Sequence, residues 1–552
     1  MTVPGRAAGS GLGPEAGLGM SSVAQFELVL VLLVAVVCLE LAARWLRLPP
    51  AAALILGGGA LAFAPGMPVL ALDPELVLVL FLPPLLMASA YFTVWRDFRR
   101  NLLGILNLAV GAVAFTTLLV GVAARWAAPA LPWAACFALG AVVSPPDAVA
   151  AKAVLERVRL PRRAMVLLEG ESLLNDAAGI VLFRFAVAAA LTGTFSVAGA
   201  AASFAALALG GIAVGGAVGL LCARALRLLQ RARELEIGIT TTLLMPWAAY
   251  VGAERAHASG VIATVVAGLL LGWRQHEIFR ANGRRTGTAV WRVVVYLLEA
   301  LVFVLIGLSL RGVLERLGGA GDVARAFGPP VLAVVGAVVL SRFAWVIGAD
   351  RLAALRDRVR GGGAGPPGLA ASVVMGWAGM RGVVTLAVAL SVPEAMPGRD
   401  LILVSAFAVI LVTVLVQGTT LGALVRLLGV GAVEGREERS LTRAEAGSRV
   451  AAAQLATVEA LARDADGRVR HPRLLEQYGH RARAAQRFSQ DAEVLAGERS
   501  AHFDVVLAAV AAGRAEALRL HRSGQIHDEV LNALEHDLDL QELSAERMRE
   551  GA

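Results

Sequence analysis

Long apolar segments alternate with short charged ones over the first 430 residues of the chain. A helix needs about 20 residues to cross the hydrocarbon core of a membrane, and thirteen segments approach or exceed that length. Their approximate limits are 23–42, 49–65, 73–91, 101–123, 133–151, 164–192, 198–222, 235–252, 259–273, 290–310, 329–350, 367–391 and 400–427. Only helices and closed barrels satisfy their backbone hydrogen bonds in lipid. The pattern therefore predicts an all-α membrane protein with about thirteen transmembrane helices, in contact with the lipid bilayer.

The composition agrees with many membrane spans rather than one large soluble core. Of 552 residues, 57% are hydrophobic and 17% are charged, which lies outside the usual range of soluble proteins. The three cysteines, Cys38, Cys136 and Cys222, lie far apart in or beside apolar segments, and the eight histidines lie outside these segments. This distribution predicts neither a disulfide nor a metal cofactor. The positive charges sit between the apolar segments instead of forming one soluble patch, so we expect no nucleic-acid partner.

The distribution of positive charge predicts the orientation of the chain. Alternate loops carry 22 Lys or Arg residues, and the opposite set carries 6. Because cytoplasmic loops are the positive ones, the N-terminus is expected outside the cell and the C-terminus in the cytoplasm. The bias recurs at successive loops, which supports both the number and the phase of the predicted spans.

The chain is predicted to have three parts. Residues 1–22 are rich in Gly, Ala and Pro and are expected to form a disordered leader, followed by a transmembrane domain at 23–427. Residues 431–552 carry 17 Arg and 21 Asp or Glu, with apolar residues at steps of three and four. This pattern predicts a cytoplasmic helical domain. Such a domain is more often a solvated tail than a regulatory or dimer-forming element, and both alternatives stay open.

Charged residues inside predicted spans are the candidates for function, because burying a charge in lipid costs several kcal/mol. The sixth span holds the densest cluster. At about 100° per residue, Glu169, Ser172 and Asp176 lie on one side of the helix, and Glu171 and Asn175 occupy the adjacent strip. Two carboxylates, an amide and a hydroxyl at this depth favour an ion site over a structural polar face.

Two predicted spans contain helix-breaking residues close to a charge. Pro145 and Pro146 precede Asp147 in the fifth span, and three glycines surround Arg381 within residues 376–382 of the twelfth. Interrupted helices near the membrane midplane are typical of secondary transporters. Freed carbonyls beside a carboxylate suit a hard cation such as Na⁺. The positions of the two breaks also suggest inverted six-helix repeats, formed by spans one to six and eight to thirteen.

Two further charged residues lie deep inside predicted spans and need partners. Arg342 in the eleventh span can neutralise one carboxylate of the sixth, because Arg keeps its proton in proteins. Glu299 in the tenth span gates or supports the pathway, or is a packed, protonated acid, and the sequence does not decide between these roles.

The residues now described resemble the cation/proton antiporter-1 family of bacterial and animal sodium/proton exchangers. The most specific element is the segment Glu169–Asp176, followed by an Asp after a broken span and a Gly-x-Arg-Gly element ending at Gly382. The spacing of Glu299, Phe303 and Gly307 is similar to that of the animal exchangers. The resemblance covers all predicted spans and implies a protein of the bacterial plasma membrane, a homodimer in which a core domain moves against a dimeric scaffold.

The resemblance also implies roles for individual residues. Asp176 is implied as the carboxylate that binds the ion and the proton, so that Na⁺ lies at Asp176, Asp147 and Ser172, with support from Asn175. An ion pair between Glu171 and Arg342 is implied to hold the core together. An Asn-Asp pair is the family's mark of one-for-one, electroneutral exchange. Relatives commonly carry Thr at the position of Pro146. The side-chain hydroxyl that Thr would offer to the ion is therefore missing in this chain.

The expected function is exchange of Na⁺, with Li⁺ as a further candidate ion, for H⁺. If one buried carboxylate binds either ion but not both, and only the occupied site crosses, exchange follows from the two gradients. A K⁺/H⁺ antiporter is the nearest alternative, because the cluster does not define an ion radius, and a cation channel is a weaker one. No metalloprotease motif, phosphate-binding loop or buried nucleophile–base pair is present in the sequence, so no enzyme is expected.

Overall fold

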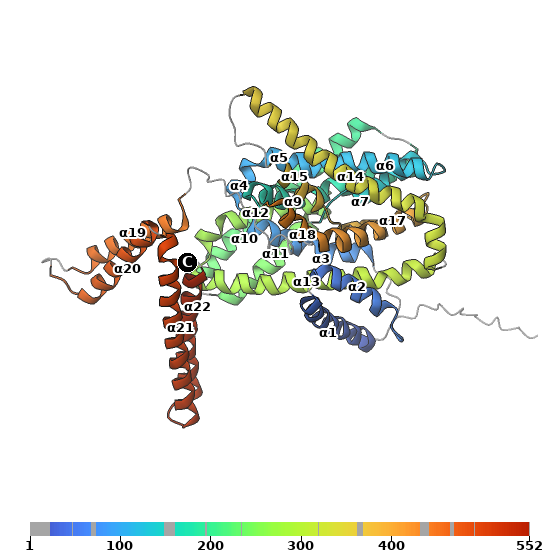
Figure 1. The fold of residues 1–552 in the computed structure, drawn as a ribbon. Coiled ribbons are helices and arrows are strands. Elements are labelled where there is room, and N and C mark those ends of the chain that lie inside the picture. The colour runs from blue at the N-terminus through green and yellow to red at the C-terminus, as the bar shows by residue number, and fades with distance from the viewer. Residues whose placement is uncertain are drawn as a thin grey trace, which may run out of the picture. The chain divides into compact units, whose positions relative to one another are not determined.

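The computed structural model describes residues 22–46, 48–67, 73–147, 160–193, 196–232, 234–317, 319–360, 368–430, 441–463, 468–490 and 492–550. These residues form helices joined by turns, and their only β-type pairing is an isolated bridge between Arg463 and Val469. Eight of the described helices are long and apolar enough to span a membrane. The predicted leader at 1–22 lies almost wholly outside the described residues. The fold is thus all-α, as the sequence predicts (Figure 1).

The chain divides into two units, Met1–Glu434 and Gly435–Ala552. The helices of the first unit are α1 (Ser22–Leu46), α2 (Pro50–Ala62), α3 (Pro74–Phe92), α4 (Trp95–Arg100), α5 (Leu102–Leu106), η1 (Asn107–Ala112), α6 (Val113–Ala127), α7 (Trp133–Val143), α9 (Arg162–Thr192), α10 (Val197–Ala232), α11 (Leu235–Arg255), α12 (Gly260–Ile278), α13 (Ala281–Arg316), α14 (Ala320–Arg360), α15 (Leu369–Trp377), α16 (Val383–Leu390), α17 (Arg399–Val412), η2 (Thr413–Gln417) and α18 (Gly418–Leu428). The second unit contains α19 (Arg443–Leu461), α20 (Pro472–Gln490), α21 (Ala492–Arg522) and α22 (Asp528–Glu550). The total of thirteen spans and their inverted repeats stay predictions.

The observed helices differ from the predicted spans mainly in length. Helices α13 and α14 extend beyond the apolar segments predicted at 290–310 and 329–350. Their added turns are rich in Arg, whose long side chains keep the charge in water while the stem lies along apolar surface. Apolarity therefore reports the membrane-spanning part of a helix, whereas backbone hydrogen bonding continues past it.

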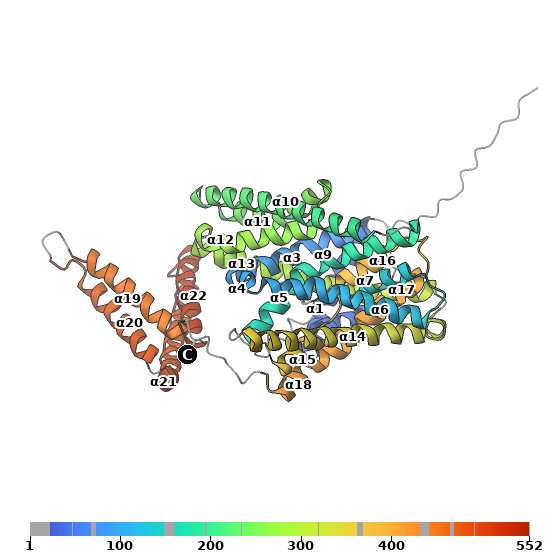
Figure 2. The same cartoon turned by 90° about the horizontal axis from the view of Figure 1, so that it is seen from above.

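The helices of the first unit form two packing groups. In the first, α2 packs on α13, α3 on α12, and α10 on both α11 and α12. In the second, α6 packs on α7 and α14, α7 packs on α9, and α15 and α17 pack on α14. Figure 2 shows α10 and α14 at opposite sides of the bundle, with α3 and α9 between them. Because α3 contacts both α9 and α16, the boundary between the groups passes through the middle of the unit.

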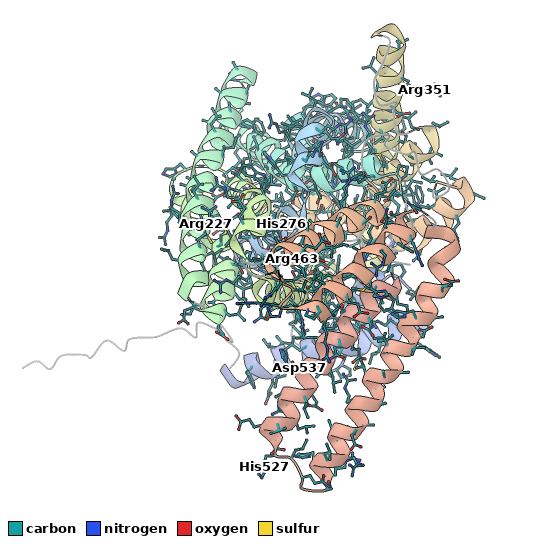
Figure 3. The ribbon with its side chains drawn as sticks, turned by 90° about the vertical axis from the view of Figure 1, so that its left-hand side faces the viewer. Arg227, His276, Arg351, Arg463, His527 and Asp537 are labelled. Atoms are coloured by element: carbon teal, nitrogen blue, oxygen red, sulfur yellow. The ribbon has the colours of Figure 1, made fainter. Side chains whose placement is uncertain are left out.

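The second unit consists of two helical hairpins. Helix α19 packs on α20, and α21 packs on α22. Figure 3 labels His527 at the turn between α21 and α22, and Asp537 farther along α22. Arg514 of α21 bridges two acids of α22, Asp539 and Glu542, with nitrogen–oxygen distances of 2.6 and 2.5 Å. The helical character predicted for 431–552 is thus present at 443–461, 472–490, 492–522 and 528–550, and its cytoplasmic location stays a prediction.

Candidate functional site

The break in the fifth predicted span begins where its two prolines begin. Helix α7 ends at Val143, and Ser144–Asp147 is not helical. A proline has no N–H to donate and its ring crowds the preceding turn, so Pro145 and Pro146 weaken α7 here. Two prolines in succession do not end a helix by themselves, since Pro83–Pro84 lie inside α3 and Pro329–Pro330 inside α14. Beyond the break, the backbone N–H of Asp147 donates to the carbonyl of Met380 at 2.7 Å. The chain after α7 is thereby attached to the second interrupted span.

The second interruption lies between α15 and α16. Helix α15 ends at Trp377, α16 begins at Val383, and the intervening residues pass close to Asp147. A Cβ atom built on Gly382 would lie 1.8 Å from Oδ2 of Asp147. Since non-bonded atoms do not approach so closely, a side chain at this position would displace the carboxylate of Asp147. The two breaks predicted separately from Pro and Gly therefore meet at one point.

Arg381 occupies the gap that the broken α7 leaves. Its guanidinium donates from Nε to the carbonyl of Val143 at 2.8 Å, from Nη2 to that of Ser144 at 3.1 Å, and from Nη1 to that of Gly379. The residue is 1% exposed, and a buried charge of this kind is stable only when its donors are bonded. We expected freed carbonyls to face a cation, but those of Val143 and Ser144 already accept hydrogen bonds from Arg381.

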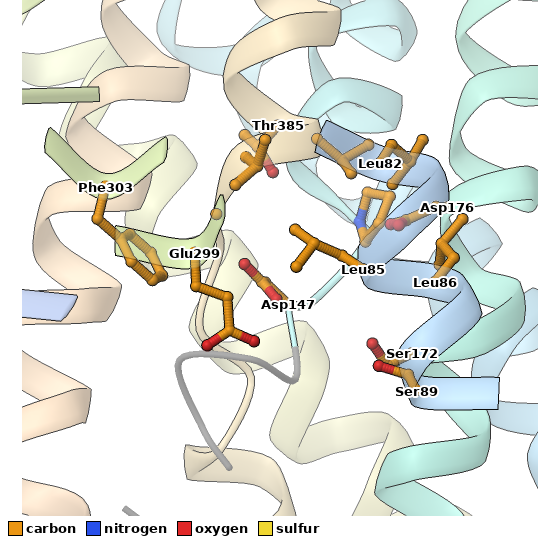
Figure 4. A pocket seen from close by; sticks show the side chains of 14 residues that line it. Leu82, Leu85, Leu86, Ser89, Asp147, Ser172, Asp176, Glu299, Phe303 and Thr385 are labelled. Atoms are coloured by element: carbon orange, nitrogen blue, oxygen red, sulfur yellow. The ribbon is translucent and has the colours of Figure 1, made fainter. Parts of the chain in front are cut away.

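A cavity of about 50 Å³ lies at the crossing, on the boundary between the two packing groups (Figure 4). One water molecule needs about 10–15 Å³ on the same measure, so the cavity has room for a small ion with a few waters. Its lining comes from α3, α9, α13, α16 and the chain after α7. The lining residues are Leu82, Leu85, Leu86, Ser89, Pro145, Asp147, Ser172, Asp176, Glu299, Phe303, Gly382, Val383, Val384 and Thr385.

Asp176 lies at the cavity wall and is 9% exposed. Within the described residues its carboxylate forms no hydrogen bond or ion pair. Its neighbour Asn175 is fully buried, and its Nδ2 donates to the carbonyl of Pro146. Asn175 therefore connects α9 to the broken end of α7, while Asp176 faces the cavity. Pro146 contributes this carbonyl, whereas the ring that lines the cavity is that of Pro145.

Glu171 faces a different partner from Asp176. Arg342 of α14 donates to both of its carboxylate oxygens, from Nη1 to Oε1 and from Nη2 to Oε2, the latter at 2.7 Å. The two side chains are 1% and 3% exposed. Two parallel hydrogen bonds between guanidinium and carboxylate form the strongest geometry for such a pair. The structure thus brings together the two residues expected to form a core ion pair.

Of the two remaining acidic residues predicted for the site, one lines the cavity and the other does not. Glu299 of α13 lines the cavity and enters it from the first packing group, opposite α9. Glu169 is exposed and is not part of the lining. The predicted polar sector of α9 is therefore narrower than expected: Ser172 and Asp176 face the cavity, while Glu169, two turns earlier, does not.

Helix α3 contributes a cavity wall that the sequence pattern does not predict. Leu82, Leu85, Leu86 and Ser89 recur at steps of three and four, which places them on one helix face. Three leucines in an apolar span are typical of packing or lipid contact, so the pattern alone did not indicate a site. Ser89 was the available signal, as a polar residue on that face. Thr385, near the start of α16, also lines the cavity, and as a single polar residue in an apolar segment it did not indicate a site.

Two crossed, interrupted spans beside a cavity lined by carboxylates define a membrane transporter rather than a soluble binding protein. Comparison with known proteins gives the family. The sodium/hydrogen exchanger transmembrane family matches residues 29–427, and the chain belongs to this family. Its members are secondary transporters and not enzymes.

Several relatives are similar over most of the chain. An Escherichia coli protein named as an uncharacterized Na⁺/H⁺ exchanger, YjcE, is 33% identical over 85% of this chain and 89% of its own length. A Bacillus pumilus protein named as a sodium, potassium, lithium and rubidium/H⁺ antiporter is 33% identical over 72% of this chain and 60% of its own. The solved sodium proton antiporter MjNhaP1 of Methanocaldococcus jannaschii has the same fold, with a TM-score of 0.54, 20% identity and coverage of 73% and 99%.

Proposed function

We propose that this protein exchanges Na⁺ for H⁺, one for one, at a site centred on Asp176. The observation that carries the proposal is the state of that carboxylate: it is buried at the boundary of two helix groups, faces a cavity and has no bonding partner among the described residues. Burial favours the neutral form of a carboxylate, so a proton or a cation must neutralise it. Competition between the two ions for Asp176 yields exchange.

The ligands proposed for the cation are oxygen atoms around the cavity. Asp176 and Ser172 belong to α9, and Asp147 follows the broken end of α7. A small, hard cation prefers such oxygen ligands. Asn175 and Pro146 support the site indirectly. The amide of Asn175 donates a hydrogen bond to the carbonyl of Pro146 and so fixes the chain that leads to Asp147.

Movement of the two packing groups against each other supplies alternating access in this proposal. Glu171 and Arg342 stabilise the second group internally, since both lie within it. Arg381 fixes the two broken spans to each other in the same group, and Glu299 faces them from the first. The site therefore lies where relative movement changes its exposure. We further propose a homodimer in the bacterial plasma membrane, with the N-terminus outside and the second unit in the cytoplasm.

The test is proton flux in proteoliposomes that contain the purified chain and a pH-sensitive dye. Adding Na⁺ or Li⁺ should drive protons across the membrane, and reversing the Na⁺ gradient should reverse the flux. Setting a membrane potential with a thiocyanate gradient should leave the rate unchanged if exchange is electroneutral. A rate that follows the potential contradicts one-for-one exchange, and a cation flux that ignores the proton gradient indicates a channel.

Potassium is the second candidate ion, and a specific observation favours testing it. The Bacillus pumilus relative is named as an antiporter of sodium, potassium, lithium and rubidium. In addition, Pro146 offers no side-chain hydroxyl to the shell. Equal proton flux on addition of K⁺ and Na⁺ would identify a broad cation/proton antiporter, whereas flux with K⁺ alone would replace the sodium proposal.

A further inference from the structure

Ser89 belongs to the wall of the cavity that α3 forms. It shares one helix face with Leu82, Leu85 and Leu86, and all four line the cavity. The three leucines are 4%, 9% and 6% exposed, whereas Ser89 is exposed. Its hydroxyl is therefore not covered by packing. Among the described lining residues, it is the one polar side chain that α3 presents to the site.

The hydroxyl of Ser89 is also free of the usual helical bond. Many Ser and Thr hydroxyls in the helices of the first unit donate to a backbone carbonyl one turn earlier, as Thr117 does to Val113 at 2.8 Å. Thr93 donates in the same way to the carbonyl of Ser89, at 2.8 Å. Neither Ser89 nor Ser172 forms a side-chain hydrogen bond within the described part of the chain. Two hydroxyl oxygens at the cavity thus remain available to a ligand.

These two hydroxyls come from opposite packing groups. Ser172 and Asp176 lie on α9 in the second group, while Ser89 lies on α3 in the first, and the two helices are in contact. Both side chains line the same cavity, and Figure 4 labels Ser89 and Ser172 at the edge of the site. An ion held by oxygens of both groups would be bound most tightly when the groups are in this arrangement.

We propose that Ser89 is a cation ligand supplied by the first helix group, which completes the oxygen shell that Asp176 and Ser172 begin. A proton needs only the carboxylate of Asp176, but a dehydrated cation needs several oxygens. Ser89 therefore sets the affinity for the cation without affecting proton binding, and it ties cation binding to the relative position of the two groups. The inference rests on the proposed exchange function.

The experiment compares Na⁺ dependence of proton flux in proteoliposomes for three variants. Ser89→Ala removes the hydroxyl and Ser89→Thr keeps it. Thr93→Val is the matched control, because Thr93 follows the last residue of α3, four residues after Ser89, and its hydroxyl bonds only the backbone. Ser89→Ala should raise the half-saturating Na⁺ concentration about tenfold, equivalent to about 1.4 kcal/mol, and leave the maximal rate unchanged. Ser89→Thr and Thr93→Val should stay near the unmodified protein.

An unchanged half-saturating concentration in Ser89→Ala would overturn the inference, as would an equal rise in Thr93→Val. Absence of Na⁺-driven flux in the unmodified protein would instead overturn the proposed exchange. If Ser89→Ala does not fold, Ser89→Cys can be labelled with a thiol reagent after Cys38→Ser removes the exposed native thiol. Na⁺ should slow that labelling several-fold, and the protection should disappear when Asp176→Asn is added. Labelling that is indifferent to Na⁺ contradicts the role of Ser89.

Discussion

Glu171 and Asp176 are buried on the same helix, five residues apart, in two different environments. Glu171 faces Arg342 across a packed interface and has both oxygens bonded. Asp176 faces a cavity, and no described residue pairs with it. A carboxylate held in a permanent ion pair stabilises the fold, whereas a carboxylate that faces a cavity is available to bind a proton or a cation. The same helix therefore carries one structural acid, Glu171, and one acid available for ion binding, Asp176.

The largest expected effect is loss of transport on neutralising the acid at the cavity. Asp176→Asn removes the charge on which H⁺ and Na⁺ compete, so we expect proton flux to fall to the background of empty vesicles. The fold should persist, because no ion pair is broken. Dye-based flux in vesicles measures transport, and elution of the purified protein as a single peak in size-exclusion chromatography reports that the fold persists. Glu169→Gln is the control, since Glu169 is exposed and outside the cavity lining. Retained Na⁺-dependent flux in Asp176→Asn would show that the exchange site lies elsewhere.

Neutralising the paired acid, Glu171, should lower the stability of the protein more than neutralising Asp176 does. Glu171→Gln leaves the buried guanidinium of Arg342 without its counter-charge, and breaking a buried pair in this way costs about 3–5 kcal/mol. We expect a large drop in thermal stability in detergent, greater than that of Asp176→Asn. Removing both charges, with Glu171→Gln and Arg342→Met, should recover part of the loss. If Glu171→Gln is as stable as the unmodified protein, the ion pair does not hold the core together.

Much of this comparison could be predicted from the residues. The cluster Glu169–Asp176, the prolines before Asp147 and the glycines around Arg381 each combine a feature that is expensive in lipid with a nearby charge, so they identified the site region. What the sequence could not supply was orientation across helices. The leucines of α3 have no chemistry that marks a cavity wall, and nothing local indicated that Arg381 takes up the carbonyls of Val143 and Ser144.

The limits of helix patterns explain the other differences. A period of 3.6 residues assigns Glu169 to the same sector as Asp176, but the two residues are two turns apart along α9, and Glu169 lies outside the cavity lining. Helix ends were also misplaced, because Arg-rich turns continue α13 and α14 beyond their apolar segments. Pairing was accessible only in part: Arg342 was expected to neutralise one carboxylate of the sixth span, and the choice of Glu171 came from the family resemblance.

A substitution at Gly382 is expected to reduce transport and stability by an amount between the large effects at Asp176 and Glu171 and the small effect at Asp97. Gly382→Ala would place a methyl group 1.8 Å from Oδ2 of Asp147, so the carboxylate of Asp147 must move. Overpacking of this kind costs about 1–3 kcal/mol, and we expect a larger loss of flux than of stability because the displaced carboxylate faces the cavity. Gly216→Ala on α10 is the control, since a Cβ there meets no atom within 4 Å. Flux equal in both variants would show that the position of Asp147 is not critical.

The smallest effect is expected at a second ion pair of α9, which is exposed rather than buried. Arg162, the first residue of the helix, donates from Nη2 to Oδ2 of Asp97 at 2.6 Å, but its side chain is 63% exposed. Water and salt screen such pairs, and they contribute about 0.2–1 kcal/mol. Asp97→Asn should therefore lower the melting temperature far less than Glu171→Gln, and high salt should reduce even that difference. A loss comparable to that of the buried pair would mean that the end of α9 is held as tightly as its middle, and burial would then no longer explain the contrast between the two pairs.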